Sequence, residues 1–205
     1  MKIDYNKLMQ QEISDISSAF NNKSSFGEKP KLLLHCCCAP CSSAVINRLK
    51  EYFEITFYYY NPNTYPQTEY DKRAQEFVKL GVNIVKADYN HDDFLQLIKG
   101  KEYEKEGGAR CQMCIALRLD KTFEYAIGNN FDIVTTTLSI SPHKDAEYIN
   151  MLGERLQKKY GIKYLHADFK KQNGYLQSIQ ICKDLDIYRQ DYCGCEFSLS
   201  NRKEN

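Results

Sequence analysis

The sequence has no tryptophan, no long apolar run and almost no net charge. Without about eighteen consecutive apolar residues, we expect no membrane-spanning helix. The polar N-terminus lacks the apolar core of a secretory signal, which predicts a cytoplasmic protein. A formal net charge of +1 excludes a protein that coats nucleic acid by bulk electrostatics, although a local basic patch could still dock one RNA.

The chain of 205 residues is long enough for one domain with a proper core. We predict a short helix and a flexible connection in residues 1–30, and a single α/β domain in residues 31–205. Hydrophobic periodicity predicts strands at 32–37, 55–60, 82–87, 133–138 and 163–167. It predicts helices at 42–51, 68–80, 92–98, 111–127, 145–160 and 175–185. Such alternation indicates a parallel sheet with helices on both faces.

In such sheets the ligand site lies beyond the carboxyl ends of the strands. Unusual residues follow four of the predicted strands, in segments 37–41, 61–63, 139–144 and 168–171. This convergence predicts one site assembled from several loops.

Nine cysteines are present, and an odd number in a cytosolic chain is a poor disulfide framework. Eight of them form three groups: Cys36, Cys37, Cys38 and Cys41; Cys111 and Cys114; Cys193 and Cys195. Thiolates bind soft metals and iron–sulfur clusters, and a two-residue spacer lets two sulfurs reach one metal centre. Three such groups indicate metal binding or redox catalysis.

Two cysteines have a simpler interpretation. Pleating points Cys36 away from Cys37, and Cys182 lies alone within a predicted helix, so we expect both in the hydrophobic core. Seven candidate ligands exceed the four that one structural zinc needs, and instead suit a four-cysteine iron–sulfur cluster with a second redox or metal element. Cys193 and Cys195 could close into a redox-active disulfide or bind a second iron, and the sequence leaves both open.

Five segments together resemble the epoxyqueuosine reductases of the QueH type: LLLHCCCAPCS, YYYNPNTYPQTEYDKR, EGGARCQMCIALRL, TTTLSISPHKD and YRQDYCGCEFS. The resemblance covers about residues 31–198. It implies a Rossmann-like parallel sheet of about five strands in the order 3-2-1-4-5, similar to the adenine nucleotide alpha-hydrolase group. In that group the loop after the first strand is a glycine-rich pyrophosphate loop; here HCCCAPCS replaces it, so we do not expect ATP.

The resemblance also implies an activity and its cofactors. Members of this family reduce epoxyqueuosine at the wobble position of tRNA to queuosine, with a 4Fe-4S cluster and either an additional iron or a redox-active cysteine pair. Matched by position, the cluster ligands are Cys37, Cys38, Cys111 and Cys114. The second element, a mononuclear iron or a redox pair, falls on Cys193, Cys195 and Cys41.

Reduction of an epoxide to an alkene and water needs two electrons and two protons. As proton donors we consider Asp145, His143 and Tyr175, with Arg189 as a further candidate on a matching segment. For the anticodon loop we expect stacking on aromatic rings and basic contacts to phosphates. The candidates are Asn61, Tyr65, Lys144, Lys171 and Arg189, with added surface from Lys170 and the tyrosines at 58–60, of which at least one should be core. The sequence does not identify the electron donor.

Two other functions are consistent with the cysteines. One is a zinc-stabilised RNA-binding module without catalysis, which would contain zinc and no acid-labile sulfide. The other is a thiol-dependent tRNA sulfurtransferase, which would need ATP activation and is disfavoured by the missing pyrophosphate loop.

Overall fold

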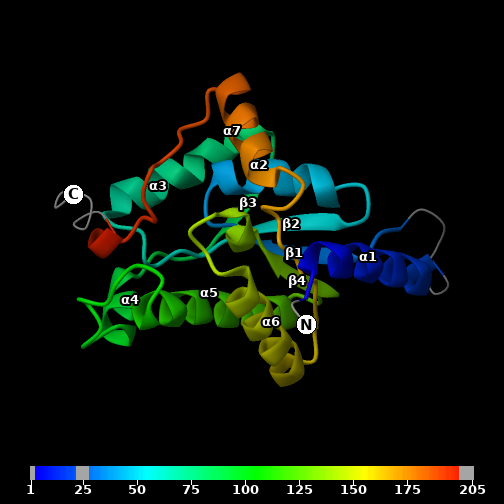
Figure 1. Ribbon diagram of the computed structural model, residues 1–205, viewed down its shortest axis with the longest axis horizontal. Helices are drawn as coiled ribbons and strands as arrows, with labels where there is room; N and C mark the ends of the chain where they lie inside the picture. The colour runs from blue at the N-terminus through cyan, green and yellow to red at the C-terminus, as the bar shows by residue number, and fades with distance from the viewer. Residues whose placement is uncertain (1–2, 22–27, 199–205) are drawn as a thin grey trace.

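The computed structural model describes residues 3–21 and 28–198, and within them a parallel sheet occupies the centre of the molecule (Figure 1). Its strands are β1 (Lys31–His35), β2 (Glu54–Tyr59), β3 (Ile84–Lys86), β4 (Ile133–Thr136) and β5 (Lys163–Tyr164). Every neighbouring pair is parallel, and the spatial order is β3-β2-β1-β4-β5. This confirms the predicted Rossmann-like α/β fold and its strand order.

Helices cover both faces of the sheet, as predicted. In Figure 1, α2, α3 and α7 lie on one side of the strands, and α4, α5 and α6 lie on the other. The helices are α1 (Tyr5–Asn21), α2 (Ala39–Leu49), α3 (Gln67–Gln75), α4 (His91–Leu97), α5 (Ala109–Gly128), α6 (Ala146–Tyr160) and α7 (Gly174–Asp184). Two 3-10 segments, η1 (Glu76–Leu80) and η2 (Thr137–Ile140), follow α3 and β4. No helix in the described part of the chain is both long and apolar enough to span a membrane.

The central strand β1 is buried on both faces, which explains why its sequence is a continuous apolar run. Leu32 and Leu34 pack in one core with residues of α2, whereas Leu33 packs in a second core with residues of α5 and α6. Alternation continues past the strand, so that Cys36 joins the first core and Cys37 packs against the second. The sheet thus directs adjacent cysteines to opposite faces.

Most differences from the predicted elements lie at their ends, and one predicted helix is divided in two. Strand β4 stops at Thr136 rather than 138 because the Thr136 Oγ1 accepts a hydrogen bond from the Leu138 N (3.2 Å) and starts η2. The predicted helix 68–80 divides into α3 and η1, and the fifth strand pairs only over Lys163–Tyr164. The helix predicted at 111–127 begins two residues earlier, at Ala109.

The predicted N-terminal helix is α1, and it packs on the sheet domain. Met9 and Ile13 belong to the first core, and the Glu12 carboxylate accepts hydrogen bonds from the Lys163 Nζ (2.6 Å) and the His166 N (2.9 Å). The predicted flexible connection includes residues 22–27, which lie outside the described residues. The division into a segment 1–30 and a domain 31–205 stays a prediction.

Candidate functional site

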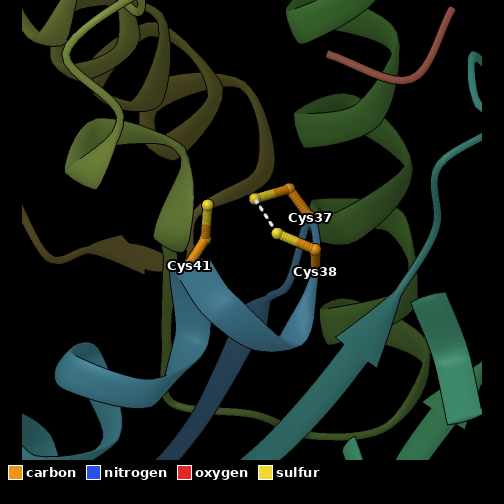
Figure 2. A group of neighbouring side chains, drawn as sticks. All are labelled: Cys37, Cys38 and Cys41. Carbon is orange, nitrogen blue, oxygen red and sulfur yellow. Dashed lines mark hydrogen bonds between the residues drawn. The ribbon is translucent and has the colours of Figure 1, made fainter. Parts of the chain in front are cut away.

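Three cysteine thiols meet where β1 leads into α2, with Cys37 and Cys38 in the connecting loop and Cys41 in the first turn of α2 (Figure 2). The Sγ atoms of Cys37, Cys38 and Cys41 all lie within 4.8 Å of one another, and those of Cys37 and Cys38 are 3.8 Å apart. Metal–thiolate bonds of about 2.3 Å keep two sulfurs of one ion within roughly 4.6 Å of each other. This spacing therefore suits one thiophilic metal ion.

Hydrogen bonds hold the three-cysteine loop in place. Cys36 donates its N–H to the Tyr58 carbonyl (2.8 Å), and its own carbonyl accepts from the Asn61 Nδ2 (2.9 Å). On the other side the Thr137 Oγ1 accepts from the Cys37 N (3.2 Å) and lies 3.4 Å from the Cys37 Sγ. Pro40 then starts α2, where its missing N–H costs nothing. The sulfurs thus lie at a helix N-terminus, which favours thiolate.

His35 supports the cysteine loop through hydrogen bonds of its neutral imidazole. Because a carbonyl can only accept, the His35 Nε2 donates to the Tyr60 O (3.2 Å), so the Nδ1 accepts from the Thr136 Oγ1 (2.8 Å). Burial, with the nearby positive charge of Arg118, lowers the pKa of His35 to about 3. The ring thereby ties the ends of β2 and β4 to β1 without adding charge.

The three thiols differ in pKa, and Cys37 loses its proton most readily. Hydrogen bonds from Cys38 and Cys41 hold the pKa of Cys37 well below its ordinary value. The same hydrogen bonding to Cys37 raises the pKa of Cys38 to about 12 and raises the pKa of Cys41. Cys37 is accordingly the thiolate of the group, stabilised by two neutral thiols.

A second thiol group lines a smaller cavity beside the first. Its sulfurs come from Cys111 and Cys114 in the first turns of α5, and from Cys193 and Cys195 near the described C-terminal end. Burial raises the pKa of Cys114 to about 11 and that of Cys195 to about 12. The geometry therefore places Cys111 and Cys114 with the Cys-Gly-Cys pair, and Cys37 and Cys38 with Cys41, which differs from the predicted partition.

The Cys-Gly-Cys turn is anchored to the rest of the domain by its backbone. Gly194 has φ +120°, a conformation that other residues rarely adopt, and an added Cβ would lie 2.7 Å from the Arg73 Nη1. The Gly194 carbonyl accepts from the Tyr65 N (2.9 Å), and the Cys193 carbonyl accepts from the Arg73 Nη1 (3.1 Å). Arg73 itself is held by Glu69 (2.7 Å). These contacts bring the two sulfurs to the cavity.

Three basic side chains, Arg110, Arg118 and Lys144, line the same smaller cavity. Within the described ranges no carboxylate oxygen lies within 4.0 Å of any of them. The Lys144 Nζ instead donates to the Cys193 Sγ (3.1 Å), and the Nε atoms of Arg110 and Arg118 are buried without a partner among the described residues. Buried charges need compensation, so this cavity is built for negative charge. Four thiols surrounded by cations fit an anionic metal–thiolate centre.

A larger cavity of about 400 Å³ adjoins these thiols. That volume is typical of a small-molecule site. Arg118, Lys144 and Cys193 line both cavities, which makes them neighbours. The lining comes from the loops after β1, β2 and β4, from α3, α5 and α7, and from the segment after α7. The cavity therefore lies at the carboxyl edge of the sheet, as predicted.

The larger cavity brings together many of the predicted site residues: Cys37, Cys38, Cys41, Asn61, His143, Lys144, Tyr175, Arg189 and Cys193. Both polar atoms of the Asn61 side chain are hydrogen-bonded inside the protein. Its Oδ1 accepts from the Arg118 Nη2 (2.5 Å), and its Nδ2 donates to the Cys36 carbonyl. The Arg189 guanidinium lies over the Tyr175 ring, 5.1 Å from its centroid. These two side chains form one unit in the cavity wall.

Three of the predicted proton donors and RNA contacts, Asp145, Lys171 and Tyr65, are not among the residues that line this cavity, and neither are Cys111, Cys114 and Cys195, which line the smaller one. The Asp145 carboxylate caps α6, accepting from the Glu147 N (2.9 Å) and the Tyr148 N (3.2 Å). Lys171 is exposed, with its carbonyl accepting from the Arg48 Nη2 (2.5 Å). Tyr65 is 47% exposed, and its ring packs 5.0 Å from that of His91.

The tyrosines at 58–60 do not form an RNA-stacking surface, because all three are buried. Tyr59 packs in the first core, whereas Tyr58 and Tyr60 pack in the second. The expectation that at least one is core is confirmed for each of them. Their interpretation as a binding surface was wrong because β2 is covered on both faces.

Cys36 and Cys182 are both buried in the first core, as predicted. Burial raises the pKa of each thiol, which makes both poor nucleophiles. All nine cysteines lie in the described part of the chain and are free thiols, so Cys193 and Cys195 are not bonded to each other here.

Sequence reasoning named Lys144 as a candidate site residue but missed the arginines around the thiols. Arg118 follows Cys114 by four positions on one helix, so it occupies the same face, and this spacing could have indicated it. Arg73 and Arg110 carry no comparable signal, because their contacts depend on how distant segments fold together. Thr137 lies within the predicted fourth strand, where it reads as an ordinary β-branched residue.

Comparison with known proteins identifies relatives along nearly the whole chain. The family described as "Epoxyqueuosine reductase QueH" matches residues 32–201. A protein named epoxyqueuosine reductase QueH from Streptococcus pyogenes serotype M1 is 42% identical over 96% of this chain and 78% of its own length. Proteins of the same name from Haemophilus influenzae and Thermotoga maritima are 41% and 34% identical, over 82% and 84% of this chain and 71% and 92% of their own lengths.

Proposed function

Because the chain belongs to the epoxyqueuosine reductase QueH family, we propose that it reduces epoxyqueuosine to queuosine in tRNA with a cysteine-bound 4Fe-4S cluster. It is an oxidoreductase, in agreement with the family name. The single observation that carries the cofactor assignment is the four-thiol cavity with its three basic side chains. A tRNA substrate also favours a cytoplasmic location.

We assign the cluster to Cys111, Cys114, Cys193 and Cys195. Cubane clusters take one cysteine on each of four irons, and these four thiols line one cavity. Cys37, Cys38 and Cys41 then form a compact site for a second, single iron, for which their mutual spacing within 4.8 Å is suitable. Proximity favours this partition over the one implied by sequence position, in which Cys37 and Cys38 join Cys111 and Cys114.

When bound, the metal centres would relay the two electrons of the reduction from an external reductant to the substrate. The remaining work belongs to the cavity of about 400 Å³, which receives the modified base once it leaves the anticodon stack. Arg189, held against the Tyr175 ring, offers planar donors to the base or to a phosphate. Tyr65 directly follows a residue that lines the cavity, and it is 47% exposed. Its ring therefore offers a stacking face for a neighbouring base.

Two protons must reach the substrate, and both end on the departing oxygen, which leaves as water. His143 and Tyr175 line the cavity and carry transferable protons, so we retain both as donors. Asp145 already accepts two backbone hydrogen bonds at the start of α6, and we assign it to helix capping instead. Lys171 remains a candidate for a phosphate contact outside the cavity.

Anaerobic reconstitution with iron and sulfide tests the assignment. We expect about four sulfides per chain, a cluster absorbance, and conversion of epoxyqueuosine tRNA with a chemical reductant. Cys114→Ser should lose the cluster, whereas Cys38→Ser should keep it but lose activity. Cys182→Ser is the matched control, because that thiol is buried and lines neither cavity.

Each alternative has a distinct outcome in this experiment. Cluster loss in Cys38→Ser would favour the sequence-based partition and remove ours. Zinc without acid-labile sulfide, together with tRNA binding and no turnover, would contradict the reductase and indicate a zinc-stabilised module.

A further inference from the structure

Arg118 lies between the two thiol groups. Arg118 lines the larger cavity together with Cys37 and the smaller cavity together with Cys114, and Cys193 lines both. Burial lowers the pKa of its guanidinium, but the charges of Cys114, Cys37 and Cys193 outweigh this and raise it. Lys144 also lines both cavities, and its Nζ donates to the Cys193 Sγ (3.1 Å). Arg118 is therefore a cation shared by both groups.

The position of Arg118 follows from helix geometry. Cys114 and Arg118 are four residues apart on α5 and so share a face, and the arginine side chain is long enough to extend toward the β1 loop. The residue is 2% exposed. At such burial the guanidinium has little water to solvate it.

A contact chain joins Arg118 to the first thiol group. The Arg118 Nη2 donates to the Asn61 Oδ1 (2.5 Å), and the Asn61 Nδ2 donates to the Cys36 carbonyl (2.9 Å). That carbonyl immediately precedes Cys37 and Cys38. A change at Arg118 would therefore reach the loop through two hydrogen bonds.

The charge of Arg118 requires a negative counterpart. Its Nε is buried without a partner among the described residues, and no described carboxylate is within 4.0 Å of it. An uncompensated buried charge is strongly destabilising. The thiolates of the two groups are the anions within reach, and metal binding keeps thiols ionised.

We propose that Arg118 is a positioning residue shared by both thiol sites, supplying positive charge to each and holding the Cys37–Cys38 loop through Asn61. This inference rests on the proposed function for the identity of the metals. It requires that loss of Arg118 weakens metal binding at Cys37, Cys38 and Cys41. It also requires that the cluster becomes harder to reduce, because a nearby positive charge favours the more negative reduced state.

Cobalt titration tests the first requirement without any cluster. In a full-length Cys114→Ser, Cys195→Ser background, Co²⁺ should bind the first thiol group and give thiolate-to-cobalt absorption. Adding Arg118→Gln should weaken that binding by about 10- to 100-fold, as is typical when a residue that orients metal ligands is lost. Cobalt affinity equal to that of the parent would overturn the proposal.

Redox titration tests the second requirement in the otherwise unaltered chain, followed by electron paramagnetic resonance of the reduced cluster. Arg118→Gln should shift the midpoint potential downward, and Arg118→Lys should restore it toward the wild-type value because the charge returns. Arg155→Gln on α6 is the charge-matched control, since that side chain is exposed and lines neither cavity. An unchanged potential in Arg118→Gln would refute the electrostatic role.

The Asn61→Ala variant tests the positional role of Arg118 separately from its charge. It also provides a test if Arg118→Gln does not fold. It leaves the guanidinium in place and removes the link to the Cys36 carbonyl, so Co²⁺ binding should weaken while the midpoint potential stays near wild type. Unchanged cobalt affinity would overturn the positional role. If the wild-type chain assembles no cluster, the proposed function fails, yet the cobalt titrations still decide whether Arg118 supports the first site.

Discussion

At the scale of single residues, surroundings divide the nine cysteines into three chemical kinds. Cys36 and Cys182 pack among apolar side chains, where burial raises the pKa of each thiol. Hydrogen bonds from its two neighbours lower the pKa of Cys37 well below its ordinary value. The four thiols of the smaller cavity instead face arginine and lysine. Identical side chains therefore have different chemical surroundings, which is the basis for proposing packing, ion binding and cluster binding for the three kinds.

Gly153 is a residue whose lack of a side chain is required for packing. A Cβ at this position on α6 would lie 2.3 Å from the Tyr164 ring, which is 1% exposed and cannot move aside. Gly-to-Ala in a helix normally gains about 1 kcal/mol, but overpacking costs about 1–3 kcal/mol. We expect Gly153→Ala to lower the free energy of unfolding by about 1–2 kcal/mol in urea denaturation.

Gly128→Ala provides the matched control, because nothing lies within 4 Å of the added Cβ at the end of α5. It should leave stability unchanged or raise it slightly. Tyr164→Leu should relieve part of the Gly153→Ala penalty, which a double-mutant cycle would measure. A Gly153→Ala protein as stable as wild type would contradict the packing described here.

At the scale of elements, α1 is attached to the sheet by a buried carboxylate. Glu12 accepts hydrogen bonds from Lys163 and from both the ring and the backbone of His166, next to β5. Burial alone would raise the pKa of Glu12, but these hydrogen bonds outweigh it and the pKa is lowered. The ionised form is thus favoured in the folded state, and it links the first helix of the chain to the last strand.

Replacement of Glu12 with Gln should destabilise the protein in a pH-dependent way. A carboxyl with a lowered folded pKa contributes stability above its unfolded value near 4.3, and that contribution is lost as pH falls through the folded pKa. We expect Glu12→Gln to cost about 1–3 kcal/mol at pH 7. The difference in free energy of unfolding between wild type and Glu12→Gln should narrow below about pH 4. Urea denaturation across a range of pH values measures it.

Glu154→Gln is the surface control for this experiment. Glu154 pairs with Lys158 on the exposed face of α6, and such pairs contribute little. A gap for Glu12→Gln that widens on acidification, or no gap at pH 7, would show that Glu12 does not anchor α1.

Elements were largely predictable from the sequence, whereas contacts within the site were not. Strands buried on both faces appear as apolar runs, so the sheet and its carboxyl-edge site could be inferred. The end of β4 could not, because it depends on one hydrogen bond from Leu138 to the Thr136 hydroxyl. Which thiols share a cavity could not be predicted either, because Arg73 and Tyr65 position the Cys-Gly-Cys turn from another part of the chain.

At the scale of the whole molecule, metal binding would cross-link segments that are distant along the chain. The four-thiol cavity joins the start of α5 to the segment after α7, and that segment also reaches the first thiol group through the larger cavity. Residues 188–198 contain only a short helical turn at their end, so long-range backbone and side-chain hydrogen bonds hold them, and a bound metal would add a further link. A ligand that binds only the folded state adds stability in proportion to the logarithm of its concentration over its dissociation constant.

Removal of metal should therefore lower the melting temperature and loosen the C-terminal segment. Binding at a thousand times the dissociation constant adds about 4 kcal/mol, and for a chain of this size each kcal/mol shifts the melting temperature by about 2–4 °C. We expect chelation to lower it by on the order of 10 °C and to speed tryptic cleavage after Arg189. Cys114→Ser should melt like the chelated protein, whereas Cys182→Ala should keep the full difference between loaded and metal-free forms. Equal melting temperatures and equal cleavage rates with and without metal would mean that protein contacts alone hold the segment, and that the thiols of the smaller cavity do not bind a metal that bridges these segments.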